Sequence, residues 1–178
     1  MDDIETRLRR LEDMEAIKQL KYRYCAACDA DYDSERLTAL FTKDAVWEGG
    51  AFGLYRGREA IRDFFAGAAK LIPFAVHYVT NPILEIDGER ATGEWFLWEP
   101  IVFATGNRAM WLAATYRDRY RRERGKWLFE RVALELRMLS PYEKGFAKAR
   151  LAGPPAKSDA PSTRASRPGR SAGSRRRQ

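Results

Sequence analysis

The spacing of apolar residues changes once along this chain, near Pro73, and this change restricts the fold more than any other feature. Before Pro73 the apolar side chains recur every three or four residues, a spacing that favours amphipathic helices. After it they alternate with polar side chains, as in strands that have one buried face. Helices followed by strands indicate an α+β fold rather than a parallel α/β fold.

Three helices are predicted in the first part of the chain. The longest covers residues 4–28, and either Asp2 or Asp3 can cap its N-terminus. Ser34 can cap a short second helix, and a third is expected near 58–70.

One short strand is expected between the second and third helices, and four long strands come after Pro73. Their ranges are 45–48, 75–86, 91–104, 110–122 and 127–138. Turn sequences such as Asp87-Gly88 and Gly106-Asn107 separate the long strands, which is typical of hairpins. We therefore expect a curved antiparallel sheet that wraps around the helices and leaves a pocket where the two meet.

The strand predicted over 91–104 is apolar on both faces. Trp95 and Leu97 lie on one face, and Phe96 and Trp98 lie on the other. Helices can cover only one of these faces. We therefore expect the other face to be buried between copies of the chain, in a trimer or a dimer.

The basic charge of the chain is concentrated at its C-terminus. The chain has 32 Lys and Arg against 25 Asp and Glu, a formal net charge of +7. Residues 147–178 hold nine of these basic residues, one acidic residue and no aromatic residue. We predict one α+β domain over 1–146 and a disordered basic tail over 147–178. The tail is either a solvated extension or a contact for nucleic acid.

Several kinds of site are excluded by residues that the sequence lacks. One His and two Cys cannot build the usual zinc or transition-metal sites, and no glycine motif for phosphate is present, so we expect no metal or cofactor. No apolar run is long enough to cross a membrane, and the acidic N-terminus does not resemble a signal peptide. Two Cys do not make a disulfide framework, which favours a reducing cytoplasm.

His77 is the only histidine and therefore the best candidate for a general base near neutral pH. Its position in a predicted strand also fits a core histidine with no catalytic role. Asp29 ends the first helix just after an apolar face, where a buried carboxylate needs a partner. If this helix packs on the strand of His77, the two side chains form a dyad in which Asp29 fixes the tautomer of the imidazole.

An ordered set of residues around this pair resembles a known family. The set consists of Ala16-Ile17-Lys-Gln-Leu20, Tyr24 and Asp29, then Tyr55-Arg56-Gly57, then His77-Tyr78-x-Thr80-Asn81, then Tyr116, Tyr120-x-Arg122 and Gly125-x-Trp127. It resembles the SnoaL-like branch of the nuclear-transport-factor-2-like superfamily over roughly residues 4–140. Within that branch the pattern is similar to cofactor-free lyases: bile-acid 7α-dehydratase, hexachlorocyclohexane dehydrochlorinase and, more distantly, scytalone dehydratase.

This resemblance implies a cone-shaped α+β barrel, commonly trimeric, with a pocket inside the cone. In these lyases a His removes a proton from carbon, an Asp partners the His, and hydroxide or chloride leaves. Carried over by position, His77 is the base, Asp29 is its partner, and Tyr24 assists the leaving group or polarises a carbonyl. Tyr24 and Asp29 are about 140° apart on an ideal helix, so they share a pocket only if the helix bends or ends between them.

The resemblance also implies pocket-lining positions. Glu99 and Arg137 fall where the bile-acid enzyme has polar pocket residues, although a surface ion pair is an equal alternative for each. Trp47 and Trp111 are candidates for an apolar wall, with core packing as the alternative.

The function implied is a cofactor-independent lyase that carries out β-elimination on a hydrophobic cyclic or polycyclic small molecule. An isomerase or cyclase that uses the same pocket is an alternative, since each reaction begins with proton abstraction. A second alternative is a non-catalytic member, either a small-ligand binder or a structural subunit similar to the β subunit of ring-hydroxylating dioxygenases.

Overall fold

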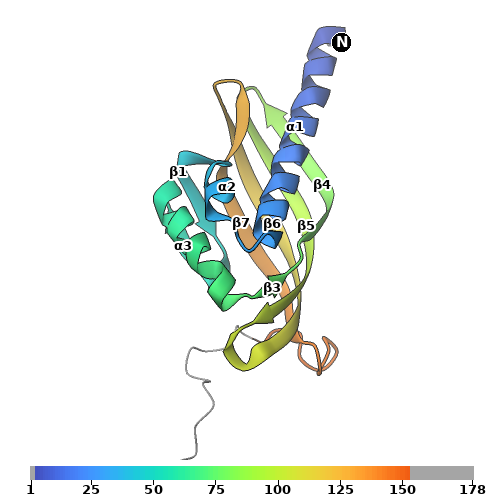
Figure 1. The fold of residues 1–178 in the computed structure, drawn as a ribbon. Helices are drawn as coiled ribbons and strands as arrows, with labels where there is room; N and C mark the ends of the chain where they lie inside the picture. Colours follow the sequence, from blue (N-terminus) through green and yellow to red (C-terminus); the bar gives the residue numbers. More distant parts are fainter. Residues whose placement is uncertain (1–2, 153–178) are drawn as a thin grey trace, which may run out of the picture.

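A long helix, α1 (Ile4–Asp29), lies along the concave side of a curled sheet in the computed structural model, which describes residues 3–152 (Figure 1). The carboxylate of Asp3 caps α1 by accepting a hydrogen bond of 2.8 Å from the backbone N–H of Thr6, as predicted. The first turns of α1 project beyond the sheet, and the second half carries the buried face. This half positions the functional residues.

Two shorter helices close one side of the curled sheet. Helix α2 (Ser34–Thr38) is capped by Asp33 rather than by Ser34, because the Asp33 carboxylate accepts from the N–H of Arg36. Helix α3 (Arg58–Leu71) packs on two strands, β1 (Phe41–Glu48) and β2 (Leu54–Arg56). A 3₁₀ turn, η1 (Gly50–Phe52), joins these two strands.

The sheet has seven strands, and its long hairpins are those that the turn sequences predict. The remaining elements are β3 (Phe74–Ala75), β4 (Tyr78–Asp87), β5 (Arg90–Phe103), η2 (Thr105–Asn107), β6 (Arg108–Glu123) and β7 (Lys126–Pro141). Strands β4 to β7 form an antiparallel meander, while β1 pairs with β7 in parallel. The expected α+β barrel is therefore confirmed as a curled, mixed sheet around α1 (Figure 1).

The predicted strand over 75–86 is broken at Val76 and His77, between β3 and β4. The reason is that the backbone N–H of His77 donates to the carboxylate of Asp29, at 3.0 Å, and not to a neighbouring strand. This contact ties the end of α1 to the sheet edge.

Alternate residues of β5 face the interior, as predicted. Trp95, Leu97 and Ile101 are buried on the inner face. On the outer face, Trp98 is 39 % exposed and stacks on Trp111 of β6, with ring centroids 5.3 Å apart. The predicted apolar outer face is thus present, and its burial between copies stays a prediction.

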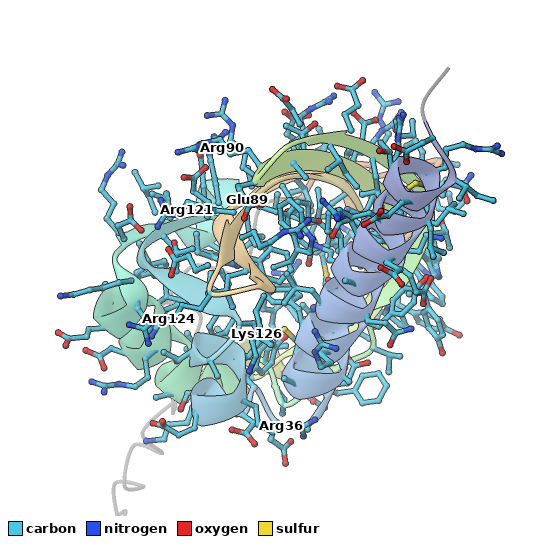
Figure 2. All side chains as sticks on the ribbon, turned by 90° about the horizontal axis from the view of Figure 1, so that it is seen from above. Arg36, Glu89, Arg90, Arg121, Arg124 and Lys126 are labelled. Carbon is cyan, nitrogen blue, oxygen red and sulfur yellow. The ribbon has the colours of Figure 1, made fainter. Side chains whose placement is uncertain are left out.

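The other end of this outer face is charged. Arg117 pairs with Glu94 and Glu135, which lie on the two neighbouring strands. Figure 2 views the molecule from the end of the barrel where the turns after β4 and β6 lie, with Glu89, Arg90, Arg124 and Lys126 labelled there. Acidic and basic side chains are paired at this end, where Glu130 contacts both Arg90 and Arg121.

The described structure continues past residue 146, where the boundary between body and tail is predicted. Leu151 bridges to Leu139 of β7, and the N–H of Ala152 donates to the Leu139 carbonyl at 2.8 Å. The rest of the predicted tail, residues 153–178, lies outside the described residues. Among the helices of the described range, none has the length and apolar character needed to cross a membrane.

A charged pair is fully buried between α1 and β6. The Lys21 ammonium lies 2.9 Å from Asp118 Oδ2 and 3.3 Å from the centroid of the Tyr116 ring. The Tyr120 hydroxyl donates to the same carboxylate oxygen at 3.0 Å. Removing one partner of such a pair destabilises the fold far more than the intact pair stabilises it.

We predict that Lys21→Met lowers the free energy of unfolding by about 3–5 kcal/mol, because it leaves the Asp118 carboxylate buried without a counter-charge. Adding Asp118→Asn should recover part of the loss, since the amide oxygen still accepts from Tyr120. Urea denaturation measures both changes. Lys18→Met, at a partly exposed position of the same helix, is the control. A single variant as stable as the wild type would contradict the prediction.

Candidate active site

The carboxylate of Asp29 holds His77 by two hydrogen bonds. Its Oδ1 atom lies 2.7 Å from Nδ1 of the imidazole and 3.0 Å from the His77 backbone nitrogen. A carboxylate can only accept, so Nδ1 carries the proton. The lone pair of a neutral His77 is therefore on Nε2, and the His77 side chain lines a pocket.

On the opposite side of the ring, Nε2 lies 3.6 Å from Oε1 of Glu99. The side chains of His77 and Glu99 are both almost completely buried, while that of Asp29 is partly exposed. Glu99 is thus a pocket residue and does not form a surface ion pair. The imidazole therefore lies between two carboxyl groups. Asp29 is hydrogen-bonded to it, and Glu99 is too far away for a hydrogen bond.

Burial and charge oppose each other at these groups. Burial alone lowers the pKa of His77, but the carboxylates of Glu99 and Asp29 outweigh burial and raise it above its ordinary value. Burial also raises the pKa of Glu99, and the charge of His77 only partly offsets this. Both groups therefore bind protons more tightly than in water.

The pocket is narrow and mostly aromatic. Its volume is about 40 Å³, and its wall includes Tyr24, Trp47, Phe64, His77 and Glu99. Small-molecule sites in proteins commonly have volumes of about 300–1,000 Å³. A ring-sized substrate therefore requires some of the aromatic side chains to move.

Tyr24 and Trp47 form the polar contact deepest in this wall. The hydroxyl of Tyr24 accepts a hydrogen bond of 2.9 Å from Nε1 of Trp47. Tyr24 is fully buried, and burial raises its pKa well above the ordinary value, so its hydroxyl keeps its proton. Helix α1 does not end between Tyr24 and Asp29. Tyr24 lines the pocket, while Asp29 is not part of the pocket wall and instead binds Nδ1 of His77.

The position of the Trp47 ring depends on a glycine. The ring lies against the backbone of Gly49, where an added Cβ atom would come within 2.3 Å of Cη2. Any larger residue at position 49 would push the indole ring into a new position.

Two of the predicted pocket residues lie elsewhere. Trp111 projects from the outer face of the sheet, between Trp98 and Tyr142. Arg137 is exposed, with its guanidinium 5.8 Å from the ring of Phe96 on that face. The pairing of β6 with β7 shifts register between Ala113 and Ala114, next to Arg137, so a regular alternation of faces could not place this residue.

Sequence reasoning missed Tyr32. Its ring is buried edge-on to His77, with centroids 6.3 Å apart, and it stacks on Phe65. Tyr32 has a positive φ of 54°, as does Asp31 before it, in the turn that comes after α1. The available signal was a single aromatic residue inside a polar break, Asp29–Asp33.

The thiols in this region are unreactive packing groups. Cys25 and Cys28 are buried and free, and burial raises the pKa of Cys25 to about 12. Within residues 3–152, no group of three or more His, Cys, Asp or Glu side chains is arranged to hold a metal ion. Besides the Cys28 thiol and the Trp47 indole, the polar groups that line the pocket are those of His77, Glu99, Tyr24, Tyr32 and Tyr116.

Comparison with known proteins gives a family match over most of the body. The SnoaL-like domain matches residues 9–133. Gamma-hexachlorocyclohexane dehydrochlorinase of Sphingobium indicum is 30% identical over 128 residues, which cover 70% of this chain and 80% of that enzyme.

Solved structures are also similar to this chain. Hexachlorocyclohexane dehydrochlorinase LinA-type3 of Novosphingobium barchaimii superposes with a TM-score of 0.70 at 26% identity, over 75% of this chain and 92% of that one. An NTF2-like protein with a cystatin-like fold from Novosphingobium aromaticivorans has a TM-score of 0.63 at 24% identity, over 83% and 96%. The second likeness supports the fold alone.

Because the chain has one histidine, NMR titration of its imidazole reports on this site alone. We predict a pKa for His77 above the ordinary value for histidine, and a lower pKa in both Asp29→Asn and Glu99→Gln, because each variant removes a nearby negative charge. ¹H–¹³C correlation spectra of the protein without a His tag measure the midpoints. Asp31→Asn, an exposed neighbour, is the control. Unchanged midpoints in both variants would contradict the assigned contacts.

Proposed function

Because the chain belongs to the SnoaL-like domain family, we propose that it is a cofactor-independent lyase that removes a proton and a leaving group from adjacent carbon atoms. The likeness to dehydrochlorinases supports a lyase-type reaction in general. The proposal that the reaction begins with removal of a proton from carbon is supported by the Asp29–His77 dyad. The dyad has a 2.7 Å hydrogen bond and an Nε2 atom that points away from Asp29.

In the proposed reaction His77 is the base. Asp29 keeps the proton on Nδ1, so that Nε2 can accept a proton from substrate carbon. The imidazolium that forms is stabilised by the carboxylate of Asp29, as in other dyads of this type. Imidazole is a weak base for carbon, so the abstracted proton must lie next to an activating group such as a carbonyl.

Tyr24 is proposed to polarise that group or to assist the leaving group. Its hydroxyl accepts from Trp47 and still has a proton to donate into the pocket it lines. Trp47 and Phe64 give the wall an apolar, aromatic character, which suits a hydrophobic cyclic substrate. Such a substrate must displace at least part of this wall.

The small volume of the pocket favours one alternative, a non-catalytic member of the family. A pocket of about 40 Å³ holds little more than a water-sized group unless it opens. In that case the Asp29–His77 dyad would serve only to join α1 to the sheet. An isomerase or cyclase would use the same proton abstraction and differ only in the fate of the carbanion or enolate that it produces.

A turnover assay with hydroxylated and halogenated cyclic ketones tests the proposal. We expect His77→Ala to lower kcat by about 10²–10⁴-fold, because it removes the base. Asp29→Asn should lose activity as well, since it changes which nitrogen carries the proton. The control is Asp31→Asn, in the turn after α1. Product analysis separates elimination from isomerisation or cyclisation.

Equal rates for wild type and His77→Ala would remove His77 from the chemistry. Absence of turnover by the wild type across the panel, together with binding of the same ketones, would instead support a ligand-binding protein.

The outer sheet face is proposed to join copies of the chain. Trp98, Trp111 and Tyr142 form a stacked apolar group there, and Tyr142 is 61 % exposed. We expect Trp98→Arg to shift the wild-type trimer or dimer toward monomer in sedimentation velocity, because it places a charge inside the contact. Glu135→Gln, on the charged part of this face, is the control. A monomeric wild type would contradict the proposal.

A further inference from the structure

Glu99 is a buried carboxyl group without a hydrogen-bond partner. Within residues 3–152, no hydrogen bond involves its side chain, and the nearest charged group is the His77 imidazole, with Nε2 at 3.6 Å from Oε1. It projects from the inner face of β5, between Leu97 and Ile101, into the pocket. A buried carboxyl group without a hydrogen-bond partner in the protein is costly, and a role in the pocket accounts for its presence there.

The pair His77 and Glu99 can hold one proton in two ways. Asp29 fixes one proton on Nδ1, so the second proton is either on Nε2, facing a carboxylate, or on Glu99, facing a neutral imidazole. The two states have the same number of protons. Burial favours the state without separated charges, while the attraction between an imidazolium and the Glu99 carboxylate favours the other, so the pair can pass between the two. In the neutral state a base and an acid lie next to each other.

We infer that Glu99 is the general acid that protonates a leaving hydroxyl group, so that the natural substrate is an alcohol rather than a halide, and that the elimination is syn. This inference rests on the proposed lyase function. It goes further by assigning the leaving group, the second catalytic residue and the stereochemistry.

The proposed step balances within the site. Nε2 of His77 takes the proton from carbon, the C–H electron pair becomes the double bond, and the C–O bond breaks. The proton of the Glu99 carboxyl goes to the departing oxygen, and water leaves. The enzyme then holds an imidazolium and a carboxylate 3.6 Å apart, and transfer of one proton from Nε2 to Glu99 restores the starting state.

The leaving group decides whether this acid is needed. Hydroxide is the conjugate base of water, whose pKa is about 15.7, so it is a poor leaving group unless it is protonated as it departs. Chloride is a stable anion that needs no proton. A carboxyl group at this place therefore accelerates the loss of hydroxide and adds nothing to the loss of chloride, which a carboxylate would repel.

The separation of the two groups decides the stereochemistry. With Nε2 and Oε1 only 3.6 Å apart on one side of the pocket, both reach the same face of the substrate. A hydrogen and a hydroxyl that are syn on adjacent carbons lie on one face. Anti elimination would need the acid on the opposite wall.

The experiment uses two matched probes, 3-hydroxycyclohexanone and 3-chlorocyclohexanone, with wild type, Glu99→Gln, Glu99→Asp and His77→Ala. We expect Glu99→Gln to lower the rate of water loss by about 10²–10⁴-fold and the rate of chloride loss at least tenfold less than that. Glu99→Asp should restore part of the water loss, because it returns the acid. The tautomer of His77, read from the ¹⁵N shifts of its ring, checks that Nδ1 still donates to Asp29 in each Glu99 variant.

Stereochemistry is read from 3-hydroxycyclohexanone that carries deuterium at C2 on one face. Loss of deuterium from the face of the hydroxyl supports the inference, and loss from the opposite face overturns it. Equal losses by Glu99→Gln on both probes would also overturn it, while loss of both activities in His77→Ala leaves the lyase function standing. If His77→Ala matches the wild type, or the wild type acts on neither probe, the proposed function fails and the inference fails with it.

Discussion

The contact between Asp29 and His77 determines the arrangement of the whole site. One carboxylate at the end of α1 binds both the backbone and the ring of His77. The first bond takes the N–H out of the sheet and separates β3 from β4, and the second sets the tautomer of the imidazole. A local hydrogen bond therefore fixes both the path of the chain and the chemistry of its only histidine.

A buried ion pair lies near this contact and is connected to the pocket. The Lys21–Asp118 pair lies fully buried between α1 and β6. Tyr116 connects this pair to the pocket, because its ring contacts the Lys21 ammonium and also lines the pocket wall. The positive charge of Lys21 opposes the protonation of His77, so it partly offsets the two carboxylates. Fold stability and the protonation of His77 thus depend on the same buried groups.

Much of this could be predicted from the sequence, because it depends on local patterns. The change of apolar spacing near Pro73 predicted the helices and the meander, and the residue types of Asp29 and His77 suggested their contact. Glu99 also carried a signal, as a charged residue in register with the buried face of β5. What could not be predicted depends on long-range geometry. The parallel pairing of β1 with β7 and the shift of register near Arg137 have no counterpart in a local pattern.

The glycine beside Trp47 has a consequence for how such a pocket can change over evolutionary time. The indole is fixed on one edge by the Tyr24 hydroxyl and on its face by a backbone that has no side chain at Gly49. The atoms nearest to a Cβ added at position 49 belong to Trp47 and Phe52, and not to Asp29, His77 or Glu99. A substitution there would reshape the space available to a ligand while the dyad stayed in place. The space available to a ligand can therefore change without any substitution at Asp29 or His77, although the hydrogen bond between Trp47 and Tyr24 changes with it.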